Sequence, residues 1–388
     1  MSTHIDIELV SDDNQKSLFR SQRIKLNGKE AKTPFRVLEP AKFSSDINLS
    51  NKSRGFNEIY KEVNSEKISS MLKDSNEHDT FSRILKNVAA KCPSEDFTIC
   101  ITRYKPTKGF SSPFPTQKEI EFLTDVSYSY SDITPLPLVE EGKYNTFFTN
   151  YLDFIKKCIK TIEELNQKPI MGIIPAYIAR ENYPKLLDYY IDQNINTFCF
   201  DFNGKTPDPL KLRPVLRYLK QKKILDVSLI YGLNSKPGRL LKNTNIIPSK
   251  DFIAYGFGLD VLGGTHSAPK LPKEFFEKMK KAIAKNQSNK KRLFIKKDYG
   301  YYKIDKKSEI EKVFPDDTSV SLAKIFSDNN KVWQQLFNME QQAIEAGEIR
   351  RRLGELGQNE SVVEYIKTKN QIQKEVKSIL TAHKAMVK

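Results

Sequence analysis

Three aspartates each follow an apolar run, and their side chains are candidates for acid–base or nucleophilic chemistry. Asp125 follows Phe-Leu-Thr, Asp201 follows Thr-Phe-Cys-Phe, and Asp260 follows Gly-Phe-Gly-Leu. A carboxylate at the end of a buried strand is partly desolvated. It can therefore serve as a nucleophile, as a general acid or base, or as an acceptor for ring N–H groups. Any one of these aspartates alone could instead cap the turn that follows it.

Glycines and amides beside these aspartates predict where a substrate would bind. Asn203-Gly204 follows Asp201 directly, and Gly263-Gly264-Thr265-His266 comes shortly after Asp260. The predicted substrate-binding residues are Asp201, Asn203, Gly204, Asn234, Gly263, Gly264 and His266. A lone loop histidine is often only a surface residue. Arg239 is a candidate phosphate clamp, although its turn also fits an ordinary surface position.

The cysteines and histidines give no indication of a metal site, and we expect no cofactor. The four cysteines are scattered without CxxC spacing, and the four histidines are equally dispersed. Such cysteine usage is the default for a reducing, cytoplasmic setting. The sequence also contains no GxSxG, HExxH or P-loop pattern, so no familiar hydrolase or nucleotide motif stands out.

Apolar strands that alternate with helix-spaced segments predict the scaffold that would position these residues. Strands are expected at 33–40, 97–102, 133–139, 169–175, 196–202, 226–231 and 251–260, and helices at 56–90, 144–165, 183–193 and 210–222. Near-continuous apolar strands indicate a parallel sheet that is buried on both faces. Seven or eight of them favour a (β/α)8 TIM-type barrel, with catalytic groups at the carboxyl ends of the strands. A doubly wound open sheet is the alternative.

The chain is expected to divide into three parts. Residues 1–268 would form the barrel with an N-terminal strand pair, 269–318 a basic aromatic segment packed on it, and 319–388 a C-terminal helical subdomain. That subdomain could also serve as a dimer contact. The N-terminus does not resemble a signal peptide, and no apolar run approaches the ~20 residues of a membrane span.

A formal net charge of +16 makes a polyanionic partner the natural expectation. Much of the excess lies in the 269–318 segment, where lysines and arginines stand beside phenylalanines and tyrosines, a combination suited to phosphate contacts and base stacking. The predicted nucleic-acid-binding residues are Arg239, Lys281, Lys290, Lys291, Arg292, Lys296 and Lys297. A solvated helix face followed by a lysine-rich turn explains the same pattern.

Short motifs between Lys25 and Ala268 resemble the tRNA-guanine transglycosylase superfamily. The opening Lys25-Leu26-Asn27-Gly28 with Thr33-Pro34-Phe35 is similar to the family's strand pair and Thr-Pro-Val-Phe, and Phe122–Ser127 to its Leu-Thr-Asp-Ser-Gly segment. Gly172–Pro175 stands where the family has a glycine-bearing strand that contacts the base, and Phe200–Gly204 where it has a Gly-Gly-Leu strand end. The family's zinc-binding cysteines have no counterpart after Cys199, and no extra RNA-binding domain is visible in the tail. Both departures suit the DNA-modifying branch.

The resemblance implies exchange of guanine in nucleic acid, DNA more than tRNA, for a 7-deazaguanine base. Asp260 would be the nucleophile that forms a covalent glycosyl-enzyme, and Asp125 the base that accepts the N9 proton. Asp201 and Asn203 would read the edge of a guanine flipped from its stack. A homodimer or partner proteins of a DNA-modification system would fit this role.

Three other functions remain open at this point. The chain could be a tRNA-guanine transglycosylase-like enzyme acting on RNA. It could be a barrel hydrolase or lyase that uses the same carboxylates on a small phosphorylated substrate. It could also be a non-catalytic nucleic-acid-binding subunit that keeps a decayed barrel.

Overall fold

The computed structural model describes most of the chain. The described residues are 4–13, 16–43, 49–106, 113–139, 148–165, 168–176, 178–267, 274, 277, 291–327, 330–354 and 361–387.

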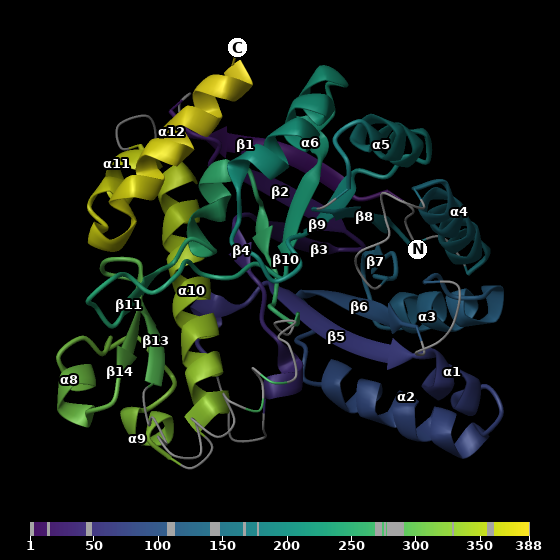
Figure 1. Cartoon of the computed structure of the whole chain (residues 1–388), viewed down its shortest axis with the longest axis horizontal. Coiled ribbons are helices and arrows are strands. Elements are labelled where there is room, and N and C mark those ends of the chain that lie inside the picture. The colour runs from purple at the N-terminus through teal and green to yellow at the C-terminus, as the bar shows by residue number, and fades with distance from the viewer. Residues whose placement is uncertain are drawn as a thin grey trace.

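A six-stranded, wholly parallel sheet lies at the centre of a mixed α/β fold, as the apolar strand pattern predicted (Figure 1). Its spatial order is β4-β12-β10-β9-β8-β7. The strands are β4 (Phe35–Arg36), β7 (Thr134–Pro135), β8 (Ile170–Pro175), β9 (Thr197–Asp201), β10 (Leu229–Leu233) and β12 (Val261–Leu262). The three longest are buried at almost every position, because helices cover the face that does not point into the core.

A second parallel pair, β5 (Phe56–Asn64) and β6 (Phe97–Lys105), contacts both edges of that sheet. Leu38, just after β4, forms a parallel bridge with Asn57, and the Glu58 amide donates to the Leu38 carbonyl at 2.8 Å. On the other side Arg103 bridges Leu138, and the Tyr104 amide donates to the Leu138 carbonyl at 2.7 Å. The two short edge strands of the six-stranded sheet therefore have hydrogen-bonded neighbours.

Amphipathic helices connect the strands and lie around the outside of the sheet (Figure 1). They are α1 (Ser65–Met71), α2 (Ser75–Ala89), α3 (Gln117–Ser129), α4 (Phe148–Glu164), α5 (Asn182–Asp192) and α6 (Pro209–Gln221). The helices expected at 183–193 and 210–222 are confirmed as α5 and α6 within a residue or two. The helix expected at 144–165 is confirmed from Phe148, and residues 144–147 lie outside the described part.

Two sequence predictions in the first half are wrong. The stretch from Phe56 begins with strand β5 rather than a helix. Its apolar residues at 56, 59 and 63 have helical spacing, but both faces of the first half of this strand are buried, so burial does not follow the strand period of two. Asp125 does not end a strand: it is exposed in the middle of α3. A capping box of Thr116 and Glu119 begins that helix, a signal that was readable in the sequence.

The strand expected at 251–260 is also wrong. Residues Phe252–Phe257 form a fully buried 3-10 helix, η4, which ends at Gly258 with a φ of 96°. A continuous apolar run is compatible with either a strand or a buried helical turn, so periodicity did not separate them. The strand at this place is β12, and it begins one residue after Asp260.

A small antiparallel sheet packs beneath the amino ends of the parallel strands. It consists of β1 (Asp6–Asp12), β2 (Arg20–Leu26) and β3 (Lys29–Lys32). The predicted strand pair and its turn are confirmed: Asn27 and Gly28 connect β2 to β3 with positive φ angles of 50° and 81°. Asn196, which precedes β9, donates to the Ile5 carbonyl and so ties this sheet to the parallel one.

The last third of the chain adds one antiparallel sheet and several helices. β11 (Ile246–Pro248) pairs with β14 (Gly300–Ile304), which pairs with β13 (Lys291–Ile295). The helices are α8 (Lys307–Glu311), α9 (Leu322–Ile325), α10 (Asn330–Gly354), α11 (Val362–Lys367) and α12 (Gln373–Val387), with short 3-10 turns η1 (Pro40–Lys42), η2 (Asn51–Ser53), η3 (Leu225–Val227) and η6 (Asn370–Ile372). The expected helical tail is confirmed. The boundaries of the three proposed parts stay a prediction.

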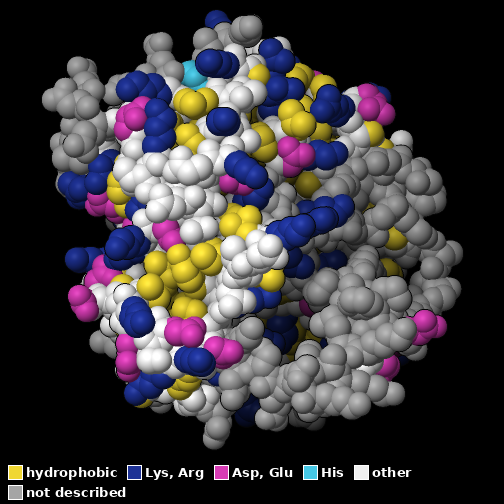
Figure 2. Space-filling view, turned by 60° about the vertical axis from the view of Figure 1, so that its left-hand side comes forward, with side chains coloured by type: hydrophobic (Ala, Val, Ile, Leu, Met, Phe, Trp, Pro, Cys, Tyr) yellow, Lys and Arg dark blue, Asp and Glu magenta, His cyan; other side chains and the backbone are white. Residues whose placement is uncertain are grey.

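The predicted nucleic-acid-binding residues have diverse environments. Arg239, Arg292 and Lys297 are exposed, whereas Lys296 pairs with Asp317 and Lys291 is buried with its ammonium over the Phe326 ring. Lys281 and Lys290 lie outside the described residues. Figure 2 shows Lys and Arg spread over one face among hydrophobic and acidic side chains. No helix in the described ranges is long and apolar enough to cross a membrane.

Candidate active site at the carboxyl ends of the strands

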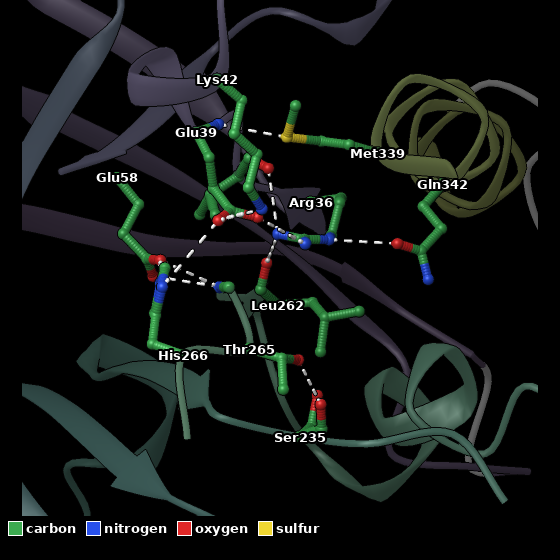
Figure 3. A network of polar contacts seen from close by, with 12 residues as sticks. Arg36, Glu39, Lys42, Glu58, Ser235, Leu262, Thr265, His266, Met339 and Gln342 are labelled. Atoms are coloured by element: carbon green, nitrogen blue, oxygen red, sulfur yellow. Dashed lines mark hydrogen bonds and ion pairs between the residues drawn. The ribbon is translucent and has the colours of Figure 1, made fainter. Parts of the chain in front are cut away.

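Glu58 is the most deeply buried carboxylate at the carboxyl ends of the parallel strands. Its side chain is fully inaccessible, and it accepts hydrogen bonds from the Tyr231 hydroxyl and from the Gly264 amide at 3.1 Å. It also accepts one from His266 Nε2 at 2.5 Å, and Figure 3 shows these two side chains facing each other. Burial, and after it the Glu58 charge, raises the pKa of Tyr231 well above its usual value, so its hydroxyl remains a donor. Glu58 is therefore satisfied on all sides and is suited to orienting His266.

His266 lies between two glutamates and against an aromatic ring. Its Nε2 faces Glu58, its Nδ1 is 3.9 Å from a Glu39 carboxylate oxygen, and its ring stacks on Tyr60 with centroids 3.9 Å apart and planes 6° apart. The side chain keeps 15 % of its surface accessible. It is therefore held in one orientation and still reachable, as a proton-transfer group must be.

Glu39 is an ionised carboxylate held by two cations. Lys42 Nζ lies 2.6 Å and an Arg36 terminal nitrogen 3.4 Å from its oxygens. Burial acts to raise the Glu39 pKa, but the charges of Lys42, His266 and Arg36 outweigh it and lower the pKa to about 2. Arg36 also donates to Gln342 of α10 at 3.1 Å, so the long C-terminal helix braces this side of the site.

Asn234 joins the loops that follow β9, β10 and β12. Its Oδ1 accepts hydrogen bonds from the amides of His266 at 2.8 Å and Ser267 at 3.1 Å, while its Nδ2 donates to Asp201 Oδ1 at 2.8 Å. Its backbone, at a φ of 56°, bonds to both Gly204 and Gly264. Asparagine tolerates this left-handed conformation better than most residues, which is one reason it fits here.

Asp201 ends β9, as predicted, and is the carboxylate of this site with an oxygen to spare. Its Oδ1 accepts the Asn203 amide at 2.9 Å as well as Asn234 Nδ2, whereas no hydrogen bond from a described residue reaches Oδ2. Burial raises the Asp201 pKa, and these hydrogen bonds together with Arg103 and His266 offset only part of that effect. A carboxylate so placed can attack an electrophile or exchange a proton.

Tyr60 and Arg103, on the adjacent strands β5 and β6, complete the polar cluster. Burial raises the pKa of Tyr60 to about 12 against the opposing charge of Arg103, so the phenol is neutral. Arg103 Nε lies 3.8 Å from Glu62, and its charge also acts on Asp201. The Arg103 charge acts to lower the Asp201 pKa, and its guanidinium is suited to an anionic ligand.

Glu39, Glu58 and His266 each offer an atom that could ligate a metal ion, and these atoms lie within 4.8 Å of one another. The charge of Glu39 is already balanced by Lys42 and Arg36, and Glu58 is fully hydrogen-bonded. A metal ion would therefore have to displace the present partners of Glu39 and Glu58, and these carboxylates carry no unbalanced charge that a metal ion would neutralise.

Asp260 lies at the opposite, amino end of the strands. Its side chain is inaccessible, with both oxygens bonded to the Arg20 guanidinium at 2.7–2.8 Å and one also accepting the Ile230 amide at 2.7 Å. Burial raises the Asp260 pKa despite the opposing charge of Arg20. A carboxylate closed off in this way has no route to a substrate, so the geometry does not support Asp260 as the nucleophile.

The structure therefore brings together most of the predicted substrate-binding residues and none of the predicted catalytic pair. Asp201, Asn234, Gly263, Gly264 and His266 share one cluster with neighbouring Asn203 and Gly204, whereas Asp125 and Asp260 lie elsewhere. Sequence reasoning missed Arg36, Glu39, Glu58, Tyr60 and Arg103. The sequence feature that could have identified them is a charged or polar residue within an apolar strand. For Glu58 this feature was not recognised, because a helix was expected where strand β5 lies.

The sequence matches no known protein-family model and no curated protein.

Proposed function

We propose that this chain is a base-exchanging glycosyltransferase that acts on nucleic acid and is built on a closed parallel barrel. The closure is supported by the β5–β6 pair, which bridges β4 on one side and β7 on the other. The strands would then follow one another as β4-β5-β6-β7-β8-β9-β10-β12, each parallel to the next. Such a barrel places its active site at the carboxyl ends of its strands.

Asp201 with its unbonded Oδ2 is the observation that carries the proposal. In this reaction Oδ2 attacks the anomeric carbon of a guanosine nucleotide, the C1′–N9 bond breaks, and its electron pair leaves with guanine. A proton supplied by the His266–Glu58 pair neutralises the departing base. The incoming 7-deazaguanine then attacks the same carbon with N9, releases Asp201 and gives its N9 proton back to His266. Asp201 and His266 thus take the roles first expected of Asp260 and Asp125.

The surroundings of Asp201 support a purine-sized, polar leaving group. Arg103 can interact with the guanine carbonyl, and the stacked Tyr60–His266 pair forms an aromatic wall beside it. The resemblance to the transglycosylase superfamily and the net charge of +16 favour a nucleic acid as the glycosyl donor, DNA more than tRNA.

The test is an exchange and trapping experiment. Purified protein is incubated with radiolabelled guanine and either DNA or tRNA, and denaturing gels reveal any covalent protein–nucleic acid adduct. We expect exchange and an adduct with the wild-type chain, and a loss of at least about 10²-fold in D201N, because the amide is not a nucleophile. D125N is the matched control and should retain activity.

The unfolding free energy separates chemistry from folding in the same variants. Burial raises the folded-state pKa of Asp201, so its ionised form destabilises the fold at neutral pH. D201N should therefore be at least as stable as wild type at pH 7 while being inactive. Full exchange activity in D201N would contradict the role of Asp201. Absence of exchange by wild type on both substrates would contradict the proposed function itself.

A further inference from the structure

The loops after β9, β10 and β12 bring an amine, a hydroxyl and a glycine together beside Asp201. Gly204 has a φ of +71°, and a Cβ at this position would lie 3.0 Å from Lys236 Nζ and 3.2 Å from Ser267 Cβ. Lys236 therefore reaches across Gly204 toward Ser267. A side chain at residue 204 would fill the space that separates these two groups.

Both polar groups are without an acidic or hydrogen-bonding partner in the described part of the chain. Ser267 is only 8 % exposed, yet its Oγ has no hydrogen-bond partner. No described carboxylate lies within ion-pair distance of the half-buried Lys236 ammonium, which sets it apart from Lys42, Lys222 and Lys250. An unsatisfied buried hydroxyl costs about 1–3 kcal/mol, so its retention beside a cation points to a ligand that bonds to it.

We propose that Lys236 and Ser267 form a phosphate subsite, with Gly204 leaving room for the phosphate to approach the backbone. The ammonium supplies a charge and three donors, and the hydroxyl supplies a fourth donor. In parallel barrels the loops after the last two strands frequently bind phosphate, and Lys236 and Ser267 follow β10 and β12. The ligand class is a phosphate monoester or diester.

Asn234 sets the position of this subsite relative to the reaction centre. The same side chain accepts the Ser267 amide and donates to Asp201, so Asn234 connects the subsite directly to the Asp201 carboxylate. Resting on the proposed function, the phosphate is the one attached to the ribose that Asp201 attacks. The subsite would fix that ribose while its base is exchanged.

The test compares K236M, K236R and S267A with K160M, which removes a positive charge from the exposed face of α4. Two probes are titrated by calorimetry and fluorescence anisotropy at several salt concentrations: ribose 5-phosphate and a single-stranded deoxyoligonucleotide. We expect K236M to weaken the binding of both probes by about tenfold. S267A should weaken it by a smaller factor, and K236R should weaken it much less than K236M does. K236M should also lower the salt slope of oligonucleotide binding by about 1, and K160M should leave all values unchanged.

Each outcome decides between the subsite and the proposed function. Equal affinities of K236M and K160M for both probes, with unchanged unfolding midpoints, would overturn the subsite. Loss of ribose 5-phosphate binding alone would keep the subsite but make its ligand a small phosphate ester, against a nucleic-acid substrate. K236M could lose binding of both ribose 5-phosphate and the oligonucleotide while the wild-type protein exchanges no guanine. That result would support the phosphate subsite and contradict the base-exchange reaction.

Discussion

Asp260 and Asp201 lie at opposite ends of the same parallel strands and differ in what their oxygens contact. Both Asp260 oxygens face the Arg20 guanidinium, and the side chain is inaccessible. Only one Asp201 oxygen is hydrogen-bonded within the described residues. The cations whose charges lower its pKa, Arg103 and His266, belong to the polar cluster at the carboxyl end of the strands. Burial raises the pKa of both carboxyls. A perturbed pKa alone therefore does not distinguish a reactive group from a structural one.

The two carboxylates differ in access and in spare bonding capacity. Arg20 also donates to the Leu225 and Ser228 carbonyls, so the Asp260 ion pair joins β2 to the segment before β10 and closes the amino end. At the carboxyl end the bonds run instead among Glu39, Glu58, Asn234 and His266, and they hold side chains around Asp201. The amino end is closed by an ion pair, whereas the carboxyl end holds a cluster of polar side chains.

Removing the Asp260 carboxylate should give the largest change in stability. D260A leaves the Arg20 guanidinium buried without its counter-ion, and the expected loss is about 3–5 kcal/mol in the free energy of unfolding. Urea denaturation measures it, with exposed D125A as the control, which should change stability by less than about 0.5 kcal/mol. A D260A protein as stable as D125A would show that the amino-end ion pair does not maintain the fold.

Substituting Asn234 should lower the free energy of unfolding by an intermediate amount and should also lower the proposed exchange activity. N234A removes the acceptor of the His266 and Ser267 amides and the donor to Asp201, and it places alanine at a φ of 56°. The expected cost is about 2–3 kcal/mol, with a fall in exchange activity because three loops lose their common anchor. Asn203 also has a positive φ, but its side chain makes none of these hydrogen bonds, so N203A is the control. N203A should lower the free energy of unfolding by less than half as much as N234A. Equal costs would assign the effect to backbone strain alone.

The smallest predicted effect is the acid dependence of stability contributed by Glu39. Its pKa is lowered to about 2, so the ionised form stabilises the fold above its ordinary pKa near 4.5. That contribution is lost as the pH falls through about 2. Between pH 6 and 2 the wild type should lose on the order of 2 kcal/mol more than E39Q. Parallel stability curves for the two proteins would show that Arg36 and Lys42 do not act on Glu39 in this way.

The sequence predicted strands β8 to β10 and their connecting helices better than the rest of the fold. Strands β8, β9 and β10 are continuous apolar runs because both of their faces are buried. Helices α5 and α6 have a clear helical period because one face of each is buried. The segments at Phe56, Asp125 and Asp251 were mistaken because short apolar runs fit strands, helices and 3-10 turns equally well. Deciding between them requires the neighbours that each run packs against.

The site shows the same division. The residues proposed for substrate binding at the ends of well-predicted strands lie close together, since parallel strands end at one edge: Asp201, Asn203, Gly204 and Asn234. Their role in substrate binding stays a prediction. Glu39, Glu58, Tyr60 and Arg103 were missed because their approach to His266 depends on pairing between strands that are far apart in the chain. No local pattern contains that information.

The sequence by itself determined that apolar strands and amphipathic helices must alternate, that polar groups end several strands, and that the surface carries a large positive charge. These properties depend on residue type and spacing, which act locally. Only the tertiary structure decided which carboxylate is sealed by Arg20 and which keeps an oxygen free beside His266. The reason is physical: the state of a buried charge depends on partners brought from distant parts of the chain, and Arg20 is 240 residues away from Asp260.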